Sequence, residues 1–207
     1  RLGRSFQSPG GVGVYLSMLL RPQCRPEELM HLTCAVGAAM CDALEQASGL
    51  RPGIKWTNDL VYGHKKAAGI LTELGMSPEG LYAVVGIGVN CCQGPQDFPQ
   101  ELRDRATSLT IETGKPIDRS LVAAAMMDAL YRMDADLLPQ KEAMLRRYKQ
   151  DCVTLGKEIS LVRGDQVSHG LALDIGDNGD LIVRFSDGHV EAVSSGEVSV
   201  RGMYGYV

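Results

Sequence analysis

The sequence predicts an α/β domain followed by a small β barrel, and two observations carry this prediction. In the first three quarters of the chain, strand-like apolar runs alternate with long stretches of helical period. From Leu155 onward, short apolar runs are separated by Gly, Asp, Asn and Ser turns, which is typical of a small all-β barrel. We therefore expect one domain over residues 1–153 and a second over residues 154–207.

One helix and several strands are expected in the first part of the chain. Residues 12–22 (VGVYLSMLLRP) are dense in branched and apolar residues and end at a proline, which indicates a buried strand. Apolar positions recur near helical period over 27–48, and Gly49 supplies the stop. Three further strands are expected, the last two joined by a tight SPEG turn, at 53–56, 68–75 and 81–90.

Two helices and the barrel complete the chain. Residues 91–117 are loop-like, and Asp118 is a suitable N-cap for the first helix. This helix is expected to carry one apolar stripe, formed by Leu121, Val122, Ala125, Met126, Ala129, Leu130 and Met133. Pro139 ends it, and a second helix is expected to run to about Asp151. The barrel strands are expected within GKEISLVRG, HGLALDIG, GDLIVRFSDG, HVEAVSS and EVSVRG.

Composition argues against several classes of function. A net charge of −4, a pI near 5.6 and the lack of a basic run give no reason to expect a nucleic-acid partner. No stretch approaches the roughly 18 uninterrupted apolar residues of a membrane span, and no signal peptide is recognisable, so no membrane partner is expected. The six cysteines form no C-x-x-C pair, which favours reduced thiols in the cytoplasm. The four histidines lack ligand spacing, so no protein metal site is assigned.

The chain begins RLGRSFQSPGGVG, without an initiator methionine, and we expect further residues upstream. Arg1 and Arg4 lie near glycines. Arginine forks suit phosphate or carboxylate groups, and glycines would let the loop wrap around them. The alternative is a mobile surface loop with ordinary charges. Phe6 is expected either in the core or as a stacking face for a base.

Residues 55–71, KWTNDLVYGHKKAAGIL, combine charged groups with a segment that resembles core. Trp56 is most simply a core anchor, and the simplest reading of the Lys65–Lys66 pair is a solvated hairpin tip. However, Lys66 precedes an apolar strand in which Gly69 leaves space beside it. A lysine there can point from the end of a sheet into a cavity with an apolar floor. This arrangement suits an anionic ligand with an apolar tail.

The GIGVN stretch (86–90) does not predict a dinucleotide-binding motif, because Cys91 stands where a third glycine is needed. No G-x-x-x-x-G-K-[ST] motif exists either. Two glycines on one strand indicate close approach of either a neighbouring strand or a ligand.

Five blocks together resemble those of biotin protein ligases, in the same order along the chain. They are RLGRSFQSPGGVGVYLSMLLRP, KWTNDLVYGHKKAAGILTELG, VVGIGVN, ATSL (106–109) and the terminal barrel. The resemblance implies a catalytic domain related to class II aminoacyl-tRNA synthetases with an SH3-like barrel behind it. It also implies that ATP, with Mg²⁺, activates biotin as biotinyl-5′-AMP. Biotin would then pass to a lysine of a biotin carboxyl carrier protein domain.

The resemblance implies a role for each candidate site residue. Lys66 aligns with the family's essential lysine, which can neutralise the reacting carboxylate and α-phosphate, and Asp59 and Arg1 complete the catalytic set. Asn58 and Asp59 would orient phosphates, Mg²⁺ or the incoming amine. The residues implied to bind biotin are Arg1, Tyr15, Ser17, Lys66, Gly69, Gly86 and Gly88. Those implied to bind the nucleotide are Arg4, Phe6, Asn58, Lys66 and Asn90.

The chain departs from the family pattern at several points. The first half of the glycine-arginine loop and the upstream serine-threonine region that binds the ureido group of biotin are absent. No DNA-binding helix-turn-helix is present, so the repressor role of some members is not expected of this chain. Phe6 stands where tryptophan is usual, and Thr57 replaces a common proline, which we interpret as a tolerated variation.

Two alternatives stay open. One is a lipoate-attaching ligase, which has a similar N-D…K-x-x-G arrangement, and the other is a non-catalytic module that senses biotin. The Trp56 block, the GIL after Lys66 and the terminal barrel favour biotin, whereas Lys66 and Asp59 favour catalysis. A homodimer is compatible with the sequence, which does not fix the oligomeric state.

Overall fold

The protein is described by a computed structural model that covers residues 10–194 and 199–202, the last four through their backbone only. The first part of the chain forms a five-stranded antiparallel sheet in the order β1-β5-β4-β3-β2. Its strands are β1 (Gly13–Leu20), β2 (Gly53–Lys55), β3 (Asp59–Tyr62), β4 (Lys65–Ser77) and β5 (Gly80–Asn90). The β4–β5 hairpin turns at Pro78–Glu79, as the SPEG motif predicts.

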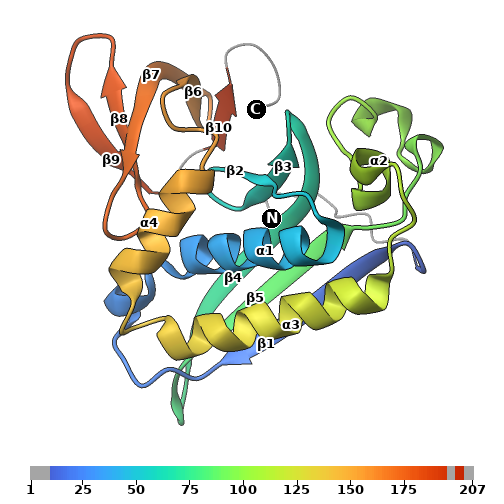
Figure 1. Cartoon of the computed structure of the whole chain (residues 1–207). Coiled ribbons are helices and arrows are strands. Elements are labelled where there is room, and N and C mark those ends of the chain that lie inside the picture. The colour runs from blue at the N-terminus through green and yellow to red at the C-terminus, as the bar shows by residue number, and fades with distance from the viewer. Residues whose placement is uncertain (1–9, 195–198, 203–207) are drawn as a thin grey trace.

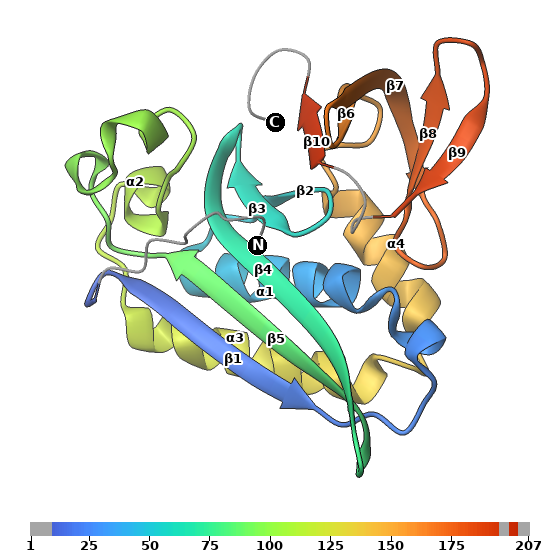
Figure 2. The same ribbon diagram turned by 180° about the vertical axis from the view of Figure 1, so that it is seen from behind.

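Two long helices cover one face of this sheet, and no helix of the described residues covers the other face (Figures 1 and 2). The covering helices are α1 (Leu32–Ser48) and α3 (Arg119–Asp136), which also pack against each other. A short 3-10 helix, η1 (Pro26–Leu29), precedes α1, and α4 (Lys141–Asp151) follows α3. Between β5 and α3 lie η2 (Pro95–Asp97), η3 (Gln100–Leu102) and α2 (Leu109–Thr113).

Local sequence signals explain where these helices begin and end. The side chain of Asp118 caps α3 by accepting from the Ser120 N–H at 2.8 Å, as predicted. Gly49 ends α1 in the left-handed conformation with φ 78°, and its N–H donates to Glu45. Most of α1 is buried because it packs between the sheet and two other helices.

The last part of the chain forms a second five-stranded antiparallel sheet, in the order β10-β6-β7-β8-β9. Its strands are β6 (Glu158–Arg163), β7 (Gln166–Ile175), β8 (Leu181–Phe185), β9 (Val190–Val193) and β10 (Ser199–Gly202). Four of them lie within the segments predicted for the barrel, whereas β7 begins at Gln166, three residues before the segment HGLALDIG. The predicted architecture, an α/β domain followed by a small all-β domain, is confirmed. No helix among the described residues is long and apolar enough to cross a membrane.

The two sheets are joined through the segment around Trp56. The N–H of Val153 donates to Ile54 at 2.9 Å, so the chain leaving α4 runs parallel to β2. The backbone N–H of Trp56 donates to the Thr154 hydroxyl at 2.9 Å, and its indole N–H donates to the carbonyl of Gly179 at 3.0 Å. Trp56 is therefore a core anchor, as predicted, and it also ties the first sheet to the β7–β8 turn.

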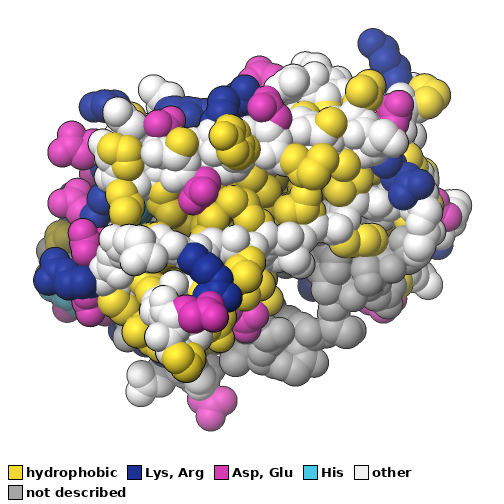
Figure 3. Space-filling view, turned by 90° about the horizontal axis from the view of Figure 1, so that it is seen from below, with side chains coloured by type: hydrophobic (Ala, Val, Ile, Leu, Met, Phe, Trp, Pro, Cys, Tyr) yellow, Lys and Arg dark blue, Asp and Glu magenta, His cyan; other side chains and the backbone are white. Residues whose placement is uncertain are grey.

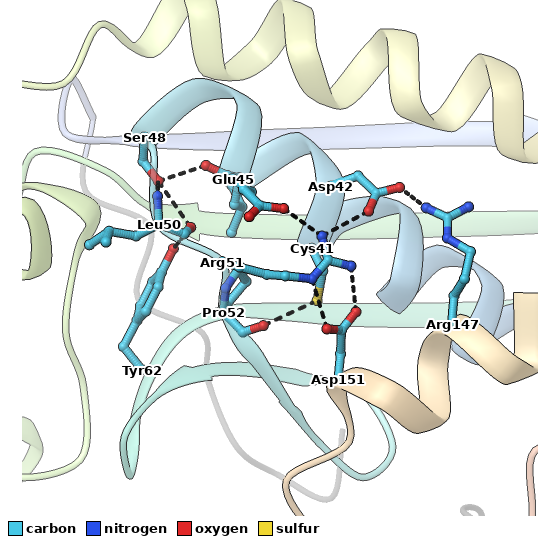
Figure 4. Close-up of polar contacts among 11 residues, drawn as sticks. Cys41, Asp42, Glu45, Ser48, Leu50, Arg51, Pro52, Tyr62, Arg147 and Asp151 are labelled. Carbon is cyan, nitrogen blue, oxygen red and sulfur yellow. Dashed lines mark hydrogen bonds and ion pairs between the residues drawn. The ribbon is translucent and has the colours of Figure 1, made fainter.

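A charged network fixes the ends of α1 and α4 on the same side of the fold (Figure 4). Arg51 donates to Asp151 at 2.6 and 2.8 Å, and to Asp42 and Glu45 at 3.0 and 2.7 Å. Asp42 also pairs with Arg147 of α4. Because its carboxylate partners favour the charged form, the pKa of Arg51 is raised above its ordinary value, chiefly by the hydrogen bond to Asp151.

Four details of the sequence prediction are wrong. Strand β1 alternates between covered and exposed positions because it is an edge strand with helices on one face only. The helix expected over 27–48 is interrupted at residues 30–31. Strand β3 was not predicted, since no strand was expected between 56 and 68. Leu121 is 63% exposed and lies outside the buried stripe of α3.

Figure 3 shows that hydrophobic side chains gather broadly across one outer face.

Candidate functional site

A row of five residues crosses the sheet from edge to edge. Tyr15 of β1 lies opposite Gly88 of β5, which lies opposite Gly69 of β4. Gly69 in turn lies opposite Asp59 of β3, and Asp59 lies opposite Lys55 of β2. Directly opposed residues in antiparallel strands project to the same face. The row therefore lies on the face away from α1 and α3, which we call the open face.

The next row on the open face contains Ser17, Gly86 and Leu71. A Cβ atom built on Gly86 would meet only the carbonyl oxygen of Leu71, at 3.9 Å. Packing within the described residues therefore does not require glycine at this position, although a ligand that lies against the strand would. Tyr15, Ser17, Gly69, Gly86 and Gly88, which the sequence predicts as biotin contacts, are thus brought together on one surface.

A β-bulge turns Lys66 onto the same open face. Register shifts between Leu60 and Val61, so that Leu60 opposes Ala68 whereas Val61 opposes Lys66. Ala67 is the extra residue. Both alanines are buried, with 0% and 2% of their surface exposed, and Ala68 belongs to the hydrophobic core. Bulges commonly redirect a side chain in this way. As a result, residues 66 and 69 share a face, which regular alternation would forbid.

The charged end of Lys66 lies over Gly69. Its Nζ is 2.5 Å from Oδ1 of Asp59, in an ion pair that is mostly covered. A Cβ atom on Gly69 would lie 2.9 Å from both Cε and Nζ of Lys66, so only glycine leaves room for the lysine in this position. The predicted proximity of Lys66, Asp59 and Gly69 therefore appears in the structure as one compact unit.

The ATSL segment supports Lys66 from the other side. The N–H of Lys66 donates to the carbonyl of Arg105 at 2.8 Å, and the N–H of Thr107 donates to the carbonyl of Lys66 at 2.9 Å. These bonds form a parallel bridge between Lys66 and Ala106. The segment occupies the place beside β4 that β5 leaves when it ends at Asn90.

The two candidate asparagines make hydrogen bonds within the fold. The side-chain amide of Asn58 donates to the Ile70 carbonyl at 2.6 Å, and the Ile70 N–H returns a bond to the Asn58 carbonyl at 2.9 Å. The Asn90 amide donates to the Thr107 carbonyl at 3.0 Å and accepts from Gln93 at 3.0 Å. Each asparagine therefore has a structural task in addition to any contact with a nucleotide.

Tyr15 is 40% exposed on the open face. Its hydroxyl lies over Gly13, where a Cβ atom would be 2.6 Å from the phenolic oxygen. Partial burial, followed by the nearby Cys91, raises the pKa of Tyr15 above its ordinary value. The hydroxyl therefore stays protonated at neutral pH and can donate a hydrogen bond.

Three predicted site residues, Arg1, Arg4 and Phe6, lie outside the described residues. Conversely, sequence reasoning missed two buried polar residues near the site. Lys55 is 7% exposed at the end of the cross-strand row, and Gln93 is 2% exposed beneath Asn90. Lys55 had a signal, since it opens the K-W-T-N-D block, but Gln93 stands in a loop with no recognisable pattern.

Two cavities lie away from Lys66. One cavity has a volume of about 330 Å³ and lies beside β4. It is lined by Thr33, Thr57, Asn58, Ile70, Leu71, Thr72 and Glu73. The other, of about 420 Å³, lies between hairpins of the second sheet and is lined by Arg163, Gln166, Val167, Ser168, Phe185, His189 and Glu191. The first cavity includes Asn58 of the candidate site and Leu71 of the open face, whereas the second shares no residue with the site.

Comparison with known families accounts for both sheets. Residues 1–90 match the biotin/lipoate A/B protein ligase family, and residues 154–201 match the biotin protein ligase C-terminal domain. Both parts of the chain are therefore similar to the class of biotin and lipoate protein ligases.

Individual relatives narrow this class. A biotin–[acetyl-CoA-carboxylase] ligase of Paracoccus denitrificans is 33% identical over 98% of this chain and 85% of its own length. The bifunctional ligase/repressor BirA of Bacillus subtilis is 30% identical over 97% of this chain. The biotin protein ligase of Aquifex aeolicus, solved with biotin and ATP, superimposes with a TM-score of 0.82 at 30% identity, over 98% of this chain and 83% of that one. This chain belongs to the biotin protein ligase family. It spans 62% of the length of the bifunctional relatives.

Proposed function

We propose that this protein is an ATP-dependent ligase that activates biotin as biotinyl-5′-AMP and transfers it to a lysine of a carboxyl carrier protein. The observation that carries the proposal is the position of Lys66, held over Gly69 by Asp59 at the border of a glycine-lined sheet face. A cation next to an open surface of this kind suits a carboxylate that is attached to an apolar ring system.

In the first step, a carboxylate oxygen of biotin attacks the α-phosphorus of ATP, and pyrophosphate leaves. Negative charge gathers on the carboxylate and the α-phosphate as they approach each other. Lys66 can stabilise this charge without reorganising, because Asp59 already fixes its ammonium group. The biotin ring system would lie against Gly69, Gly86 and Gly88, with Tyr15 and Ser17 beside it.

In the second step, the amine of a carrier lysine attacks the acyl carbon of biotinyl-5′-AMP, and AMP leaves. The attacking nitrogen loses a proton, which Asp59 or solvent can accept. Asp59 and Asn58 follow each other at the start of β3, so both can orient the incoming amine or the phosphates. We further propose that Arg1 and Arg4 close over the adenylate, that Phe6 faces the adenine, and that Asn90 contacts the nucleotide.

Mg²⁺ is proposed to arrive with ATP. Within the described residues, no three His, Cys, Asp or Glu side chains converge as a metal site, and Asp59 is already paired with Lys66. Mg²⁺ is usually held by one or two carboxylates together with substrate phosphates. Mg²⁺ held in this way needs no separate protein site, and no step above depends on one.

Biotin is favoured over lipoate by the C-terminal sheet, since residues 154–201 match the C-terminal domain of biotin protein ligases. Catalysis is favoured over sensing alone by the Lys66–Asp59 pair. We also propose that the domain boundary falls at residues 153/154, where α4 gives way to the segment that enters β6. A cytoplasmic location is supported by six free cysteines.

A homodimer is a further part of the proposal, supported by the shape of the sheet. Strand β3 pairs with β4 only as far as Gly69, so residues 71–77 of β4 have no strand beside them on that side within the described part of the chain. An open strand edge is a template for pairing with another chain. Either a second copy or the carrier domain could use it.

Biotin-dependent exchange of pyrophosphate into ATP tests the proposed function. The protein is expected to catalyse exchange with biotin and not with lipoate, and Lys66→Gln is expected to lower the rate by about a hundredfold or more. Lys65→Gln is the matched control, because its Nζ bonds only a carbonyl of the neighbouring loop, that of Arg103. Exchange at the parent rate by the Lys66 variant would show that its charge has no catalytic role.

A further inference from the structure

The main chain of Lys66 is held in place by the segment 105–107, and this segment has little regular structure of its own. It pairs with Lys66 through two backbone hydrogen bonds, at 2.8 and 2.9 Å. It belongs to a loop between η3 and α2 and joins no named strand. Something outside the backbone pairing must therefore fix the position of this segment.

Asn90 provides this link. As the last residue of β5, it is fixed by pairing with Gly13 of β1. Its side-chain amide donates to the carbonyl of Thr107 at 3.0 Å. Thr107 is fully buried, and its own N–H is one of the two groups that hold Lys66. The side chain of Asn90 thus connects the regular sheet to the segment that supports Lys66.

Gln93 in turn fixes the orientation of the Asn90 side chain. Its amide donates to Oδ1 of Asn90 at 3.0 Å, which determines which end of the Asn90 amide faces Thr107. The backbone carbonyl of Gln93 accepts from the Ser108 hydroxyl at 2.6 Å. Gln93 therefore bonds both to Asn90, which holds Thr107, and to Ser108, which follows Thr107 in the chain.

Burying Gln93 lowers the stability of the fold, because one of its polar atoms is left unpaired. Gln93 is 2% exposed, and its Oε1 has no hydrogen-bond partner within the described part of the chain. An unpaired buried acceptor is destabilising, and an apolar side chain of the same length would fill the space without that cost. Packing alone therefore does not account for a glutamine at this position.

We propose that Gln93 is a positioning residue for Lys66, acting through Asn90 and Thr107. This inference rests on the proposed function, since it assumes that Lys66 is the catalytic cation. Gln93 fixes the Asn90 amide, Asn90 fixes the carbonyl of Thr107, and the Arg105–Thr107 segment fixes the main chain from which Lys66 extends. The Lys66 ammonium then meets Asp59 in one geometry.

The test is the variant Gln93→Met, which keeps the length of the side chain and removes the donor. A small misplacement of a catalytic group can lower the rate by up to about a hundredfold, so kcat of biotin-dependent exchange is expected to fall by roughly ten- to hundredfold. The KM for biotin is expected to change little, because Tyr15, Ser17, Gly86 and Gly88 are not on this route. The thermal unfolding midpoint should stay close to that of the parent, since the unpaired oxygen is removed as well.

Thr113→Val is the matched structural control. Its hydroxyl donates to the Leu109 carbonyl at 2.7 Å, so the variant loses a hydrogen bond in the adjoining helix α2, but Thr113 is not on the route to Lys66. It is expected to lower stability and to leave kcat unchanged. Should Gln93→Met fail to fold, Gln93→Glu serves instead, because a carboxylate cannot donate to Asn90.

A double-mutant cycle tests the order of the route. Once Asn90→Ala has broken the link to Thr107, Gln93→Met is expected to have no further effect on kcat. An unchanged kcat in the single variant Gln93→Met would overturn the proposal. Equal effects of Gln93→Met in both backgrounds would also overturn it, because Gln93 would then act by another path.

A measurement without substrates separates this inference from the proposed function. The rate at which an amine-acylating reagent labels Lys66, relative to Lys65, can be followed by peptide mass spectrometry. A change of this ratio in Gln93→Met but not in Thr113→Val supports the positioning role, even if the parent shows no biotin-dependent exchange. A parent without exchange would refute the proposed function. An unchanged labelling ratio would refute the inference.

Discussion

The substitution Gly69→Ala should disable Lys66 without unfolding the protein. The added methyl carbon would lie 2.9 Å from both Cε and Nζ of Lys66, and 3.8 Å from Oδ1 of Asp59. Ordinary contacts of a Cβ atom begin at 3.4 Å, so the end of the lysine must move by about 0.5 Å or more. The backbone of Gly69 does not have a positive φ, so alanine fits the strand itself.

The effects on stability nearly cancel. Displacing Lys66 weakens its ion pair with Asp59, and pairs with partial exposure contribute about 0.2–1 kcal/mol. Alanine in place of glycine within a strand gains roughly 0.5–1 kcal/mol. The net change in the free energy of unfolding should therefore lie within about 1 kcal/mol of zero. The rate of adenylate formation, by contrast, should fall by about ten- to a hundredfold, because the ammonium no longer meets the reacting groups.

Steady-state pyrophosphate exchange and urea unfolding measure the two effects separately. Gly86→Ala is the comparison variant, because its new methyl group meets nothing closer than 3.9 Å and cannot displace Lys66. It should raise the KM for biotin by filling the open face, with a smaller effect on kcat. The reasoning would be refuted by a Gly69→Ala protein with the kcat of the parent, or by one that is strongly destabilised.

Three further changes test other parts of the structure. Trp56→Phe keeps one aromatic ring but removes the five-membered ring and its N–H donor to the Gly179 carbonyl. The lost hydrogen bond alone should lower the free energy of unfolding by about 1–3 kcal/mol in urea titrations, and the cavity left by the smaller side chain adds to this. Burial lowers the pKa of His31 below its ordinary 6.5, so the unfolded state binds protons more readily and stability should fall as pH drops below that value. Unfolding at pH 7.5 and 5.5 measures this, and His31→Asn should weaken the dependence. Arg51→Met should cost about 1–2 kcal/mol at low salt and less at high salt, because Asp151 and Glu45 lose this cation and Asp42 keeps only Arg147.

The parts of the fold that local signals determine were predictable. Asp118 and Gly49 set helix ends through their own side chain or backbone conformation, and the SPEG turn set the register of the β4–β5 hairpin. Because this hairpin fixes Gly69 opposite Gly88, two predicted site residues were bound to meet. Their proximity follows from a turn between residues that are close together in the sequence.

Other features depend on contacts between distant segments, so the sequence could not reveal them. The exposure of β1 depends on its place at the edge of the sheet, which only the strand order decides. The bond between Asn90 and Thr107 spans 17 residues, and the indole of Trp56 reaches a turn 123 residues away. Neither pair has a local pattern. The burial of Lys55 likewise depends on neighbours that a two-residue periodicity cannot identify.

The position of Lys66 depends on an irregularity that its neighbours make possible. In a regular strand, Lys66 would share a face with Ala68 and point toward the helices, where an unpaired ammonium would be strongly unfavourable. The bulge at Ala67 avoids this by changing the alternation, so that Lys66 and Ala68 lie on opposite faces while both alanines stay buried. Two alanines suit this place, since each is small enough to be fully covered and neither carries a polar group. One structural requirement, the placement of the Lys66 ammonium group on the open face, therefore explains the order lysine, alanine, alanine, glycine. The alanines let the strand bulge, the bulge brings Lys66 to the open face, and Gly69 leaves room for its ammonium group beside Asp59.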